Sequence, residues 1–118
     1  MAKTLTKAAV DKFRARLEAM RGEVLRDSEL TEDERKPVTL DQSMVGRLSR
    51  MDALQNQAMA LEAERRRGLE VQRIDAALKR IDTGDFGYCL VCGEDIEPKR
   101  LEQDPTAPSC IACAQDAG

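Results

Sequence analysis

Residues 89–113 read CLVCGEDIEPKRLEQDPTAPSCIAC and hold all four cysteines of this 118-residue chain. They form two C-x-x-C pairs, Cys89 with Cys92 and Cys110 with Cys113, separated by seventeen residues. Each pair can present two thiolates at about 2.3 Å from a tetrahedral metal, and the stretch between lets the second pair close over the first. The chain has no histidine, so every ligand of such a site would be sulfur. We therefore predict one structural zinc ion, Zn²⁺, held by these four cysteines.

Two other interpretations of the cysteines are less favoured. A pair of disulfides would need an oxidising compartment, and Met1–Val10 lacks the apolar core of a secretory signal. A redox C-x-x-C is disfavoured because one motif would suffice, and it normally opens a helix in a βαβ unit. We therefore expect a cytoplasmic protein whose thiols stay reduced.

The composition favours long helices over a large compact core. Only 3% of the residues are aromatic and 35% are charged, and the dominance of Leu, Met, Ala, Glu and Arg is typical of coiled coils. No apolar run approaches the roughly 20 residues that cross a bilayer. We expect no membrane association.

The charge is unevenly distributed along the chain. Residues 1–83 carry 17 basic and 15 acidic side chains, whereas residues 84–118 carry 2 and 7, a balance of −5. An acidic metal module repels phosphates, which argues against direct DNA binding.

A first helix is predicted from a periodic apolar stripe. Its start can be capped by Thr4 or Thr6, and it should end at about Asp27 or Ser28. The steps of three and four residues are those of a helix packed against another helix. The stripe consists of Val10, Phe13, Leu17, Met20 and Val24.

A second helix is predicted after an acidic connection, Ser28–Leu40, in which Pro37 disfavours a helical conformation at Lys36. Asp41 can cap its start, and Gly84 suits the left-handed position that follows a helix end. The stripe of this helix consists of Met44, Leu48, Met51, Leu54, Ala58 and Leu61, and it resumes at Val71, Ile74, Leu78 and Ile81.

These elements predict a mainly α fold. A long antiparallel helical hairpin, or coiled coil, would occupy residues 1–83 with its tip near 28–43, and a small four-cysteine zinc-finger module would occupy residues 84–118.

The predicted helices differ in length, which leaves part of the second one unmatched. With the hairpin centred near Lys36, Thr4 would lie opposite about Gly68. The stripe after Gly68 is therefore expected to pack on the zinc module. The apolar residues of the module that need such a core are Phe86, Tyr88, Ile96 and Leu101.

The residues around the two cysteine pairs match a longer motif. It consists of Asp85-Phe86-Gly87-Tyr88-Cys89, Cys92-Gly93, Ile96, Arg100-Leu101-Glu102, Pro105-Thr106, Cys110-Ile111 and Cys113. With this motif the zinc module resembles the zinc finger of the DksA/TraR family (DnaK suppressor proteins). Residues 69–113 carry the close resemblance, and the hairpin ahead of them resembles the family's coiled coil more loosely.

This resemblance implies a transcription regulator rather than an enzyme. Members of the family bind bacterial RNA polymerase without contacting promoter DNA. Their coiled coil enters the secondary channel, and its tip changes open-complex stability, often together with the alarmone ppGpp. The resemblance thus implies RNA polymerase as partner, ppGpp as a further ligand, and a monomer that acts in the stringent response.

Three residues outside the zinc site are implied by the same resemblance. Asp41 matches an aspartate at the coiled-coil tip that acts near the polymerase active centre, and Arg66 and Arg73 match basic residues used for alarmone or polymerase contact. The match is incomplete, because Val38 and Ser43 stand where family members carry a second aspartate and an alanine. Three alternatives stay open: Asp41 as a helix cap, Asp52 as a competing candidate for the tip residue, and Arg66 as solvated surface.

Two other classes of function stay open at this point. One is a coiled-coil zinc adaptor, and the other is a zinc module that binds nucleic acid directly. A catalytic site is not expected, because four thiolates saturate a zinc ion and the chain lacks histidine, the commonest general base.

Overall fold

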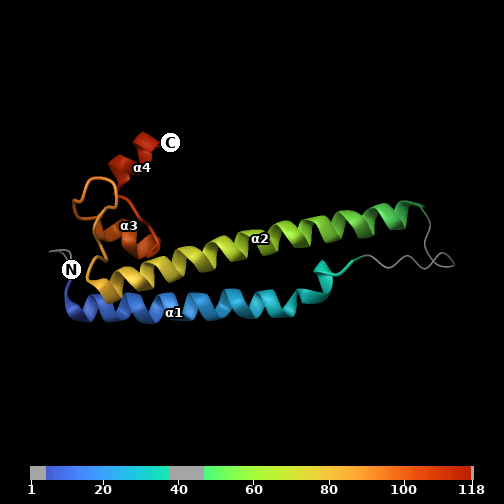
Figure 1. Cartoon of the computed structure of the whole chain (residues 1–118), viewed down its shortest axis with the longest axis horizontal. Coiled ribbons are helices and arrows are strands. Elements are labelled where there is room, and N and C mark those ends of the chain that lie inside the picture. Colours follow the sequence, from blue (N-terminus) through green and yellow to red (C-terminus); the bar gives the residue numbers. More distant parts are fainter. Residues whose placement is uncertain (1–4, 38–46, 118) are drawn as a thin grey trace. The chain divides into compact units, whose positions relative to one another are not determined.

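The computed structural model describes residues 5–37 and 47–117, and it is mainly helical. The elements in chain order are α1 (Lys7–Leu30), the 3₁₀ helix η1 (Glu32–Arg35), α2 (Arg47–Thr83), α3 (Pro98–Gln103) and α4 (Ile111–Ala117) (Figure 1). The chain divides into two compact units, Met1–Gly22 with Gln72–Gly118 and Glu23–Val71. None of the described helices combines the length and the apolar character needed to cross a membrane.

Helix α1 begins after Thr6, whose hydroxyl accepts a hydrogen bond of 3.1 Å from the N–H of Ala9. The predicted stripe is confirmed: Val10, Leu17 and Val24 are buried, and Phe13 and Met20 are partly buried. The helix ends at Leu30, slightly beyond the predicted end. Its spacing of apolar residues therefore identified the face that packs.

In the first unit, α1 and α2 pack antiparallel. Two ion pairs of 2.8 Å join them, from Arg14 to Asp82 and from Arg21 to Asp75. A hairpin centred near Lys36 would instead place these arginines opposite about residues 58 and 51. The hairpin is confirmed, but the prediction that it is centred near Lys36 is wrong. Proline dictates only that the helical conformation ends before it, not that the chain reverses there.

This register gives the end of α2 a partner in α1, contrary to the predicted mismatch. Ile74, Ala77 and Ile81 are buried in a cluster with Val10 and Leu17 of α1. The same cluster contains Phe86, Ile96 and Leu101, so the expectation that this stripe packs on the zinc module is confirmed. The rings of Phe13 and Phe86 lie 5.5 Å apart between centroids. One core therefore holds both helices and the module of the first unit together.

Helix α2 ends at Thr83 as predicted. Gly84 has φ +81°, the left-handed conformation that side chains disfavour. The N–H of Gly84 bonds to the carbonyl of Ile81 at 3.3 Å, and that of Asp85 bonds to the carbonyl of Arg80 at 2.8 Å. This Schellman motif satisfies the last helical carbonyls and turns the chain into the module.

In the second unit, the predicted apolar stripe of α2 is wrong. Met51, Leu54 and Leu61 are 58%, 46% and 50% exposed, and Ala58 is exposed too. Met44 and Asp41 lie outside the described residues. The face of α2 that contacts the segment around Lys36 instead carries small and polar side chains. The side-chain amide of Gln57, for example, donates to the carbonyl of Lys36 at 2.8 Å.

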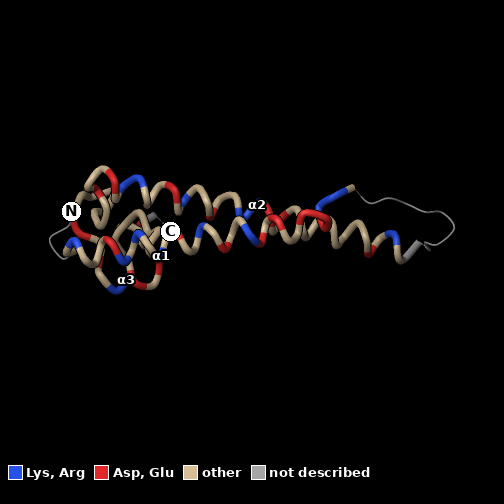
Figure 2. Tube along the Cα trace, turned by 90° about the horizontal axis from the view of Figure 1, so that it is seen from below, with Lys and Arg blue, Asp and Glu red and all other residues tan. Residues whose placement is uncertain are grey.

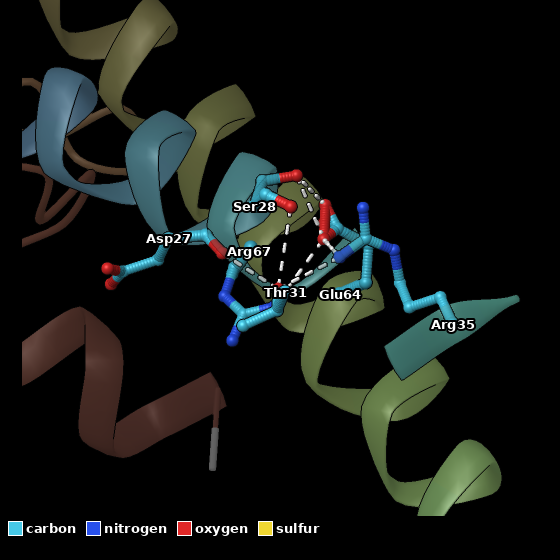
Figure 3. A network of polar contacts seen from close by, with 6 residues as sticks. All are labelled: Asp27, Ser28, Thr31, Arg35, Glu64 and Arg67. Atoms are coloured by element: carbon cyan, nitrogen blue, oxygen red, sulfur yellow. Dashed lines mark hydrogen bonds and ion pairs between the residues drawn. The ribbon is translucent and has the colours of Figure 1, made fainter. Parts of the chain in front are cut away.

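A polar network joins the elements of the second unit (Figure 3). The Glu64 carboxylate accepts a hydrogen bond from Ser28 at 3.0 Å and pairs with Arg35 at 2.9 Å. Arg35 and Arg67 both donate to the hydroxyl of Thr31, at 2.9 and 3.2 Å. These contacts replace the expected apolar seam, which explains why apolar spacing alone misplaced the inner face of this part of α2.

Basic and acidic residues are interspersed along both α1 and α2 (Figure 2). Glu62, for example, pairs with Arg65 at 2.7 Å and with Arg66 at 3.3 Å on the surface of α2. Such pairs are typical of solvated helical faces, where solvent screens the charges, so they add little to the stability of the fold.

Candidate metal centre

The first cysteine pair lies in a tight turn held by its own backbone. The N–H of Cys89 donates to the carbonyl of Glu94 at 2.7 Å, and the N–H of Gly93 donates to the carbonyl of Cys89 at 3.0 Å. The N–H groups of Val91 and Cys92 point at the sulfur of Cys89, at 3.4 and 3.5 Å. Gly93 has φ +79°, which lets the turn close.

The second cysteine pair lies at the start of α4. Cys110 is buried and Cys113 is half-buried one turn along the helix. The short helix α4 thus begins directly after Cys110, at Ile111. The N–H of Leu90 donates to the carbonyl of Pro108 at 2.9 Å. This bond joins the turn of the first pair to the segment that precedes the second pair.

The four sulfur atoms converge on one point. They all lie within 4.8 Å of one another, and those of Cys92 and Cys110 are 3.8 Å apart. A tetrahedral zinc ion with Zn–S bonds of about 2.3 Å requires sulfurs roughly 3.8 Å apart. The residues present therefore fit a zinc ion held by Cys89, Cys92, Cys110 and Cys113.

The protonation of these thiols also favours a cation. The backbone N–H of Cys92 lowers the pKa of Cys89 to about 6, so this sulfur is readily a thiolate. Hydrogen bonds to the sulfurs of Cys110 and Cys92 raise the pKa of Cys113, because they favour its protonated form, and a thiolate there would also be repelled by the charge of Cys110. A divalent cation among them would remove that penalty. Four thiolates would fill its coordination sphere, which makes the centre structural.

Arg73 and Arg66, the basic residues singled out from the sequence, both have carboxylate partners. The Arg73 guanidinium lies 3.1 Å from the Asp104 carboxylate. Asp104 in turn accepts hydrogen bonds from the N–H and the hydroxyl of Thr106, at 3.0 and 2.6 Å. Arg66 is strongly exposed and pairs with Glu62.

Two residues that hold the second cysteine pair were missed by the sequence analysis. Glu97 and Arg100 bond to backbone groups beside Cys110. A Glu-Pro step at the start of a short helix signals only a helix beginning, since proline favours the first helical position. Nothing in the spacing indicated which distant backbone these side chains would reach.

Residues 84–117 match the family described as the prokaryotic dksA/traR C4-type zinc finger. The chain is 48% identical over 64 residues to a Haemophilus influenzae protein named RNA polymerase-binding transcription factor DksA, covering 52% of this chain and 43% of that protein. It is 32% identical over 99 residues to a Caulobacter vibrioides protein of the same name, covering 84% of this chain and 68% of the relative.

A solved structure is also similar along almost the whole chain. The transcription factor DksA2 from Pseudomonas aeruginosa superposes with a TM-score of 0.77 at 27% identity, covering 94% of this chain and 84% of that one. The helices and the cysteine module thus occur together in a known protein. By contrast, the alignment with the Haemophilus relative spans less than half of that relative's length.

Proposed function

This chain belongs to the DksA/TraR family, and we propose that it is a transcription regulator that binds bacterial RNA polymerase and modulates initiation. The observation that carries the proposal is the Caulobacter relative, named for polymerase binding, whose similarity extends over 84% of the chain and so includes helices as well as the zinc module. Acting on polymerase would place the protein in the cytoplasm.

In this proposal the hairpin is the part that reaches into the polymerase, through its secondary channel. Asp41, outside the described residues, would act at the tip near the active centre. A carboxylate close to a catalytic Mg²⁺ can perturb the ion or the basic groups around it. The acidic residues Glu32, Asp33 and Glu34 of η1 add negative charge on the approach to the tip.

The zinc module would be a structural part of the regulator, without catalytic activity of its own. Its four ligands are sulfurs, which leaves a bound zinc no position for water. The negative balance of residues 84–118 argues against direct binding to DNA. We propose that the protein acts as a monomer.

ppGpp is a further proposed ligand, with Arg66 and Arg73 as its contacts. The two arginines are not equally available. Arg66 is 76% exposed, so a phosphate can approach it at the cost of a weak surface pair. Arg73 would have to leave Asp104, whose carboxylate would repel a phosphate at that position. We therefore propose that Arg66 contributes more than Arg73 to any alarmone contact.

In vitro transcription with purified bacterial polymerase tests this function. The zinc-loaded chain is expected to change open-complex lifetime at promoters whose open complexes are short-lived. Asp41→Asn should abolish that change while polymerase affinity stays close to wild type. Asp11→Asn, which alters an exposed aspartate on α1, is the matched control and should behave as wild type. An unchanged open-complex lifetime with the wild-type chain bound would contradict the proposed regulation.

A further inference from the structure

The backbone around Cys110 is held from both sides by side chains. On one side, Nε of Arg100 donates to the carbonyl of Ser109 at 2.8 Å. On the other, the N–H of Ile111 donates to Oε1 of Glu97 at 3.1 Å. The two peptide groups that flank the cysteine are thereby both fixed.

Both of these side chains come from the first turn of α3, which is itself firmly placed. Glu97 precedes the helix, Pro98 opens it, and Arg100 follows three residues after Glu97, on the same face. Leu101 is only 1% exposed and anchors the helix in the core. The carbonyl of Glu97 accepts hydrogen bonds from the N–H groups of Arg100 and Leu101, at 3.0 and 3.2 Å.

The charges at this point also suit one another. The pKa of Glu97 is lowered, first by its own backbone N–H and then by that of Ile111, with Arg100 nearby. The carboxylate is thus ionised at neutral pH and a strong acceptor for the Ile111 N–H. The helix-start residue therefore carries a charge-assisted bond to the second cysteine pair.

The first cysteine pair needs no such support. Its turn is closed by bonds between backbone groups of residues 89–94 and by N–H groups directed at the sulfur of Cys89. The second pair lacks an equivalent local turn before Cys110, since Ser109 and Ile111 find their partners on α3. The two halves of the metal centre are therefore positioned by different means.

We propose that Glu97 and Arg100 are positioning residues of the metal centre, which hold the backbone of Cys110 where zinc requires its sulfur. Groups that orient a metal ligand typically change metal affinity by about 10- to 100-fold when removed. The role is independent of polymerase and goes beyond the proposed function. It concerns how readily the module takes up and keeps its metal.

Zinc release from the full chain to an excess of chelator tests this proposal. Glu97→Ala should release zinc about tenfold faster than wild type. Glu97→Gln should stay close to wild type, because its amide oxygen can still accept the Ile111 hydrogen bond. Lys99→Ala is the matched control, since Lys99 is exposed on the same helix. Equal release rates for Glu97→Ala and wild type would overturn the proposal.

Cobalt substitution separates positioning from general destabilisation. The absorption bands of Co²⁺ report ligand geometry. Glu97→Ala and Arg100→Ala chains saturated with Co²⁺ should therefore show bands that are displaced from those of the wild-type chain. Leu101→Val, which loosens the same helix through the core, should weaken the fold but keep wild-type bands. A Glu97→Ala chain that takes up no cobalt, while Glu97→Gln does, also supports the proposal. Wild-type bands in both alanine variants, or the same displacement in Leu101→Val, would contradict it.

Discussion

At the residue scale, Glu64 is the centre of the polar contacts in the second unit (Figure 3). The hydrogen bond from Ser28, followed by the charges of Arg35 and Arg67, holds the pKa of Glu64 below its ordinary 4.5. The folded state thus binds the Glu64 proton less tightly than the unfolded chain does. Its contribution to stability is complete above pH 4.5 and is lost as the pH falls through the lower folded-state value.

Glu64→Gln should therefore destabilise the helices near neutral pH but much less in acid. Thermal unfolding followed by circular dichroism at several pH values between 7 and 3 measures this. The gap in melting temperature between variant and wild type should narrow as the pH falls. Asp52→Asn, an exposed position on the same helix, provides the control. A gap that stays constant with pH would show that the carboxylate charge does not hold this network.

Asp104 is the ion-pair partner of Arg73. The side chains of this ion pair are about half exposed, so Asp104→Asn should cost less than about 1 kcal/mol of stability. The asparagine oxygen can still accept the bonds from Thr106. With its carboxylate gone, Arg73 should bind polyphosphates more strongly, which titration with ppGpp would detect. A weaker binding in Asp104→Asn than in wild type would argue that Asp104 assists the alarmone rather than excluding it.

At the element scale, the faces of α2 can be tested by paired truncations. Ile74 is fully buried, whereas Leu54 is 46% exposed on the stripe that its spacing assigned to the interior. Ile74→Ala should lower the free energy of unfolding by about 2–5 kcal/mol. Leu54→Ala should change it by less than about 0.5 kcal/mol. Urea unfolding of both variants measures this. A large loss of unfolding free energy in Leu54→Ala would support the buried stripe predicted from the sequence.

The two helices show why apolar spacing succeeds in one place and misleads in another. In α1 the apolar stripe is the only periodic one, and Leu17 is fully buried as it predicts. In the second unit, α2 offers an apolar face with Leu61 and a face of alanines and polar residues with Glu64. The second face is partly covered because Arg35 pairs with Glu64 and Thr31 accepts a hydrogen bond from Arg67. Such partners come from tertiary structure, which no local pattern records.

At the scale of the whole molecule, zinc should stabilise more than the module itself. Cys89 and Cys110 belong to the same buried cluster as Leu17 and Ile74. Cys110→Ser should lose tightly bound zinc, disorder the module, and lower part of the helical signal as well. Ser109→Ala, the adjacent control, should keep one zinc per chain. Elemental analysis and circular dichroism measure both effects, and full zinc content in Cys110→Ser would refute the site.

The convergence of the four cysteines was predictable from sequence, whereas the core contacts between distant segments of the chain were not. Cysteine spacing constrains four ligands to one point whatever the surroundings, and the convergence of the sulfurs agrees with it. The boundary predicted at residue 83 rests on the helix end that Gly84 signals, and the division into residues 1–83 and 84–118 stays a prediction. The core of one compact unit, Met1–Gly22 with Gln72–Gly118, links segments far apart in the chain, and no local sequence pattern records such contacts.

Direct binding to purified bacterial RNA polymerase tests the central claim most directly. A fluorescently labelled, zinc-loaded chain should bind core polymerase saturably at micromolar concentrations or below, and unlabelled chain should displace it. Promoter DNA alone should not bind under the same salt conditions. A zinc-loaded, folded chain that shows no saturable binding to polymerase would contradict the account.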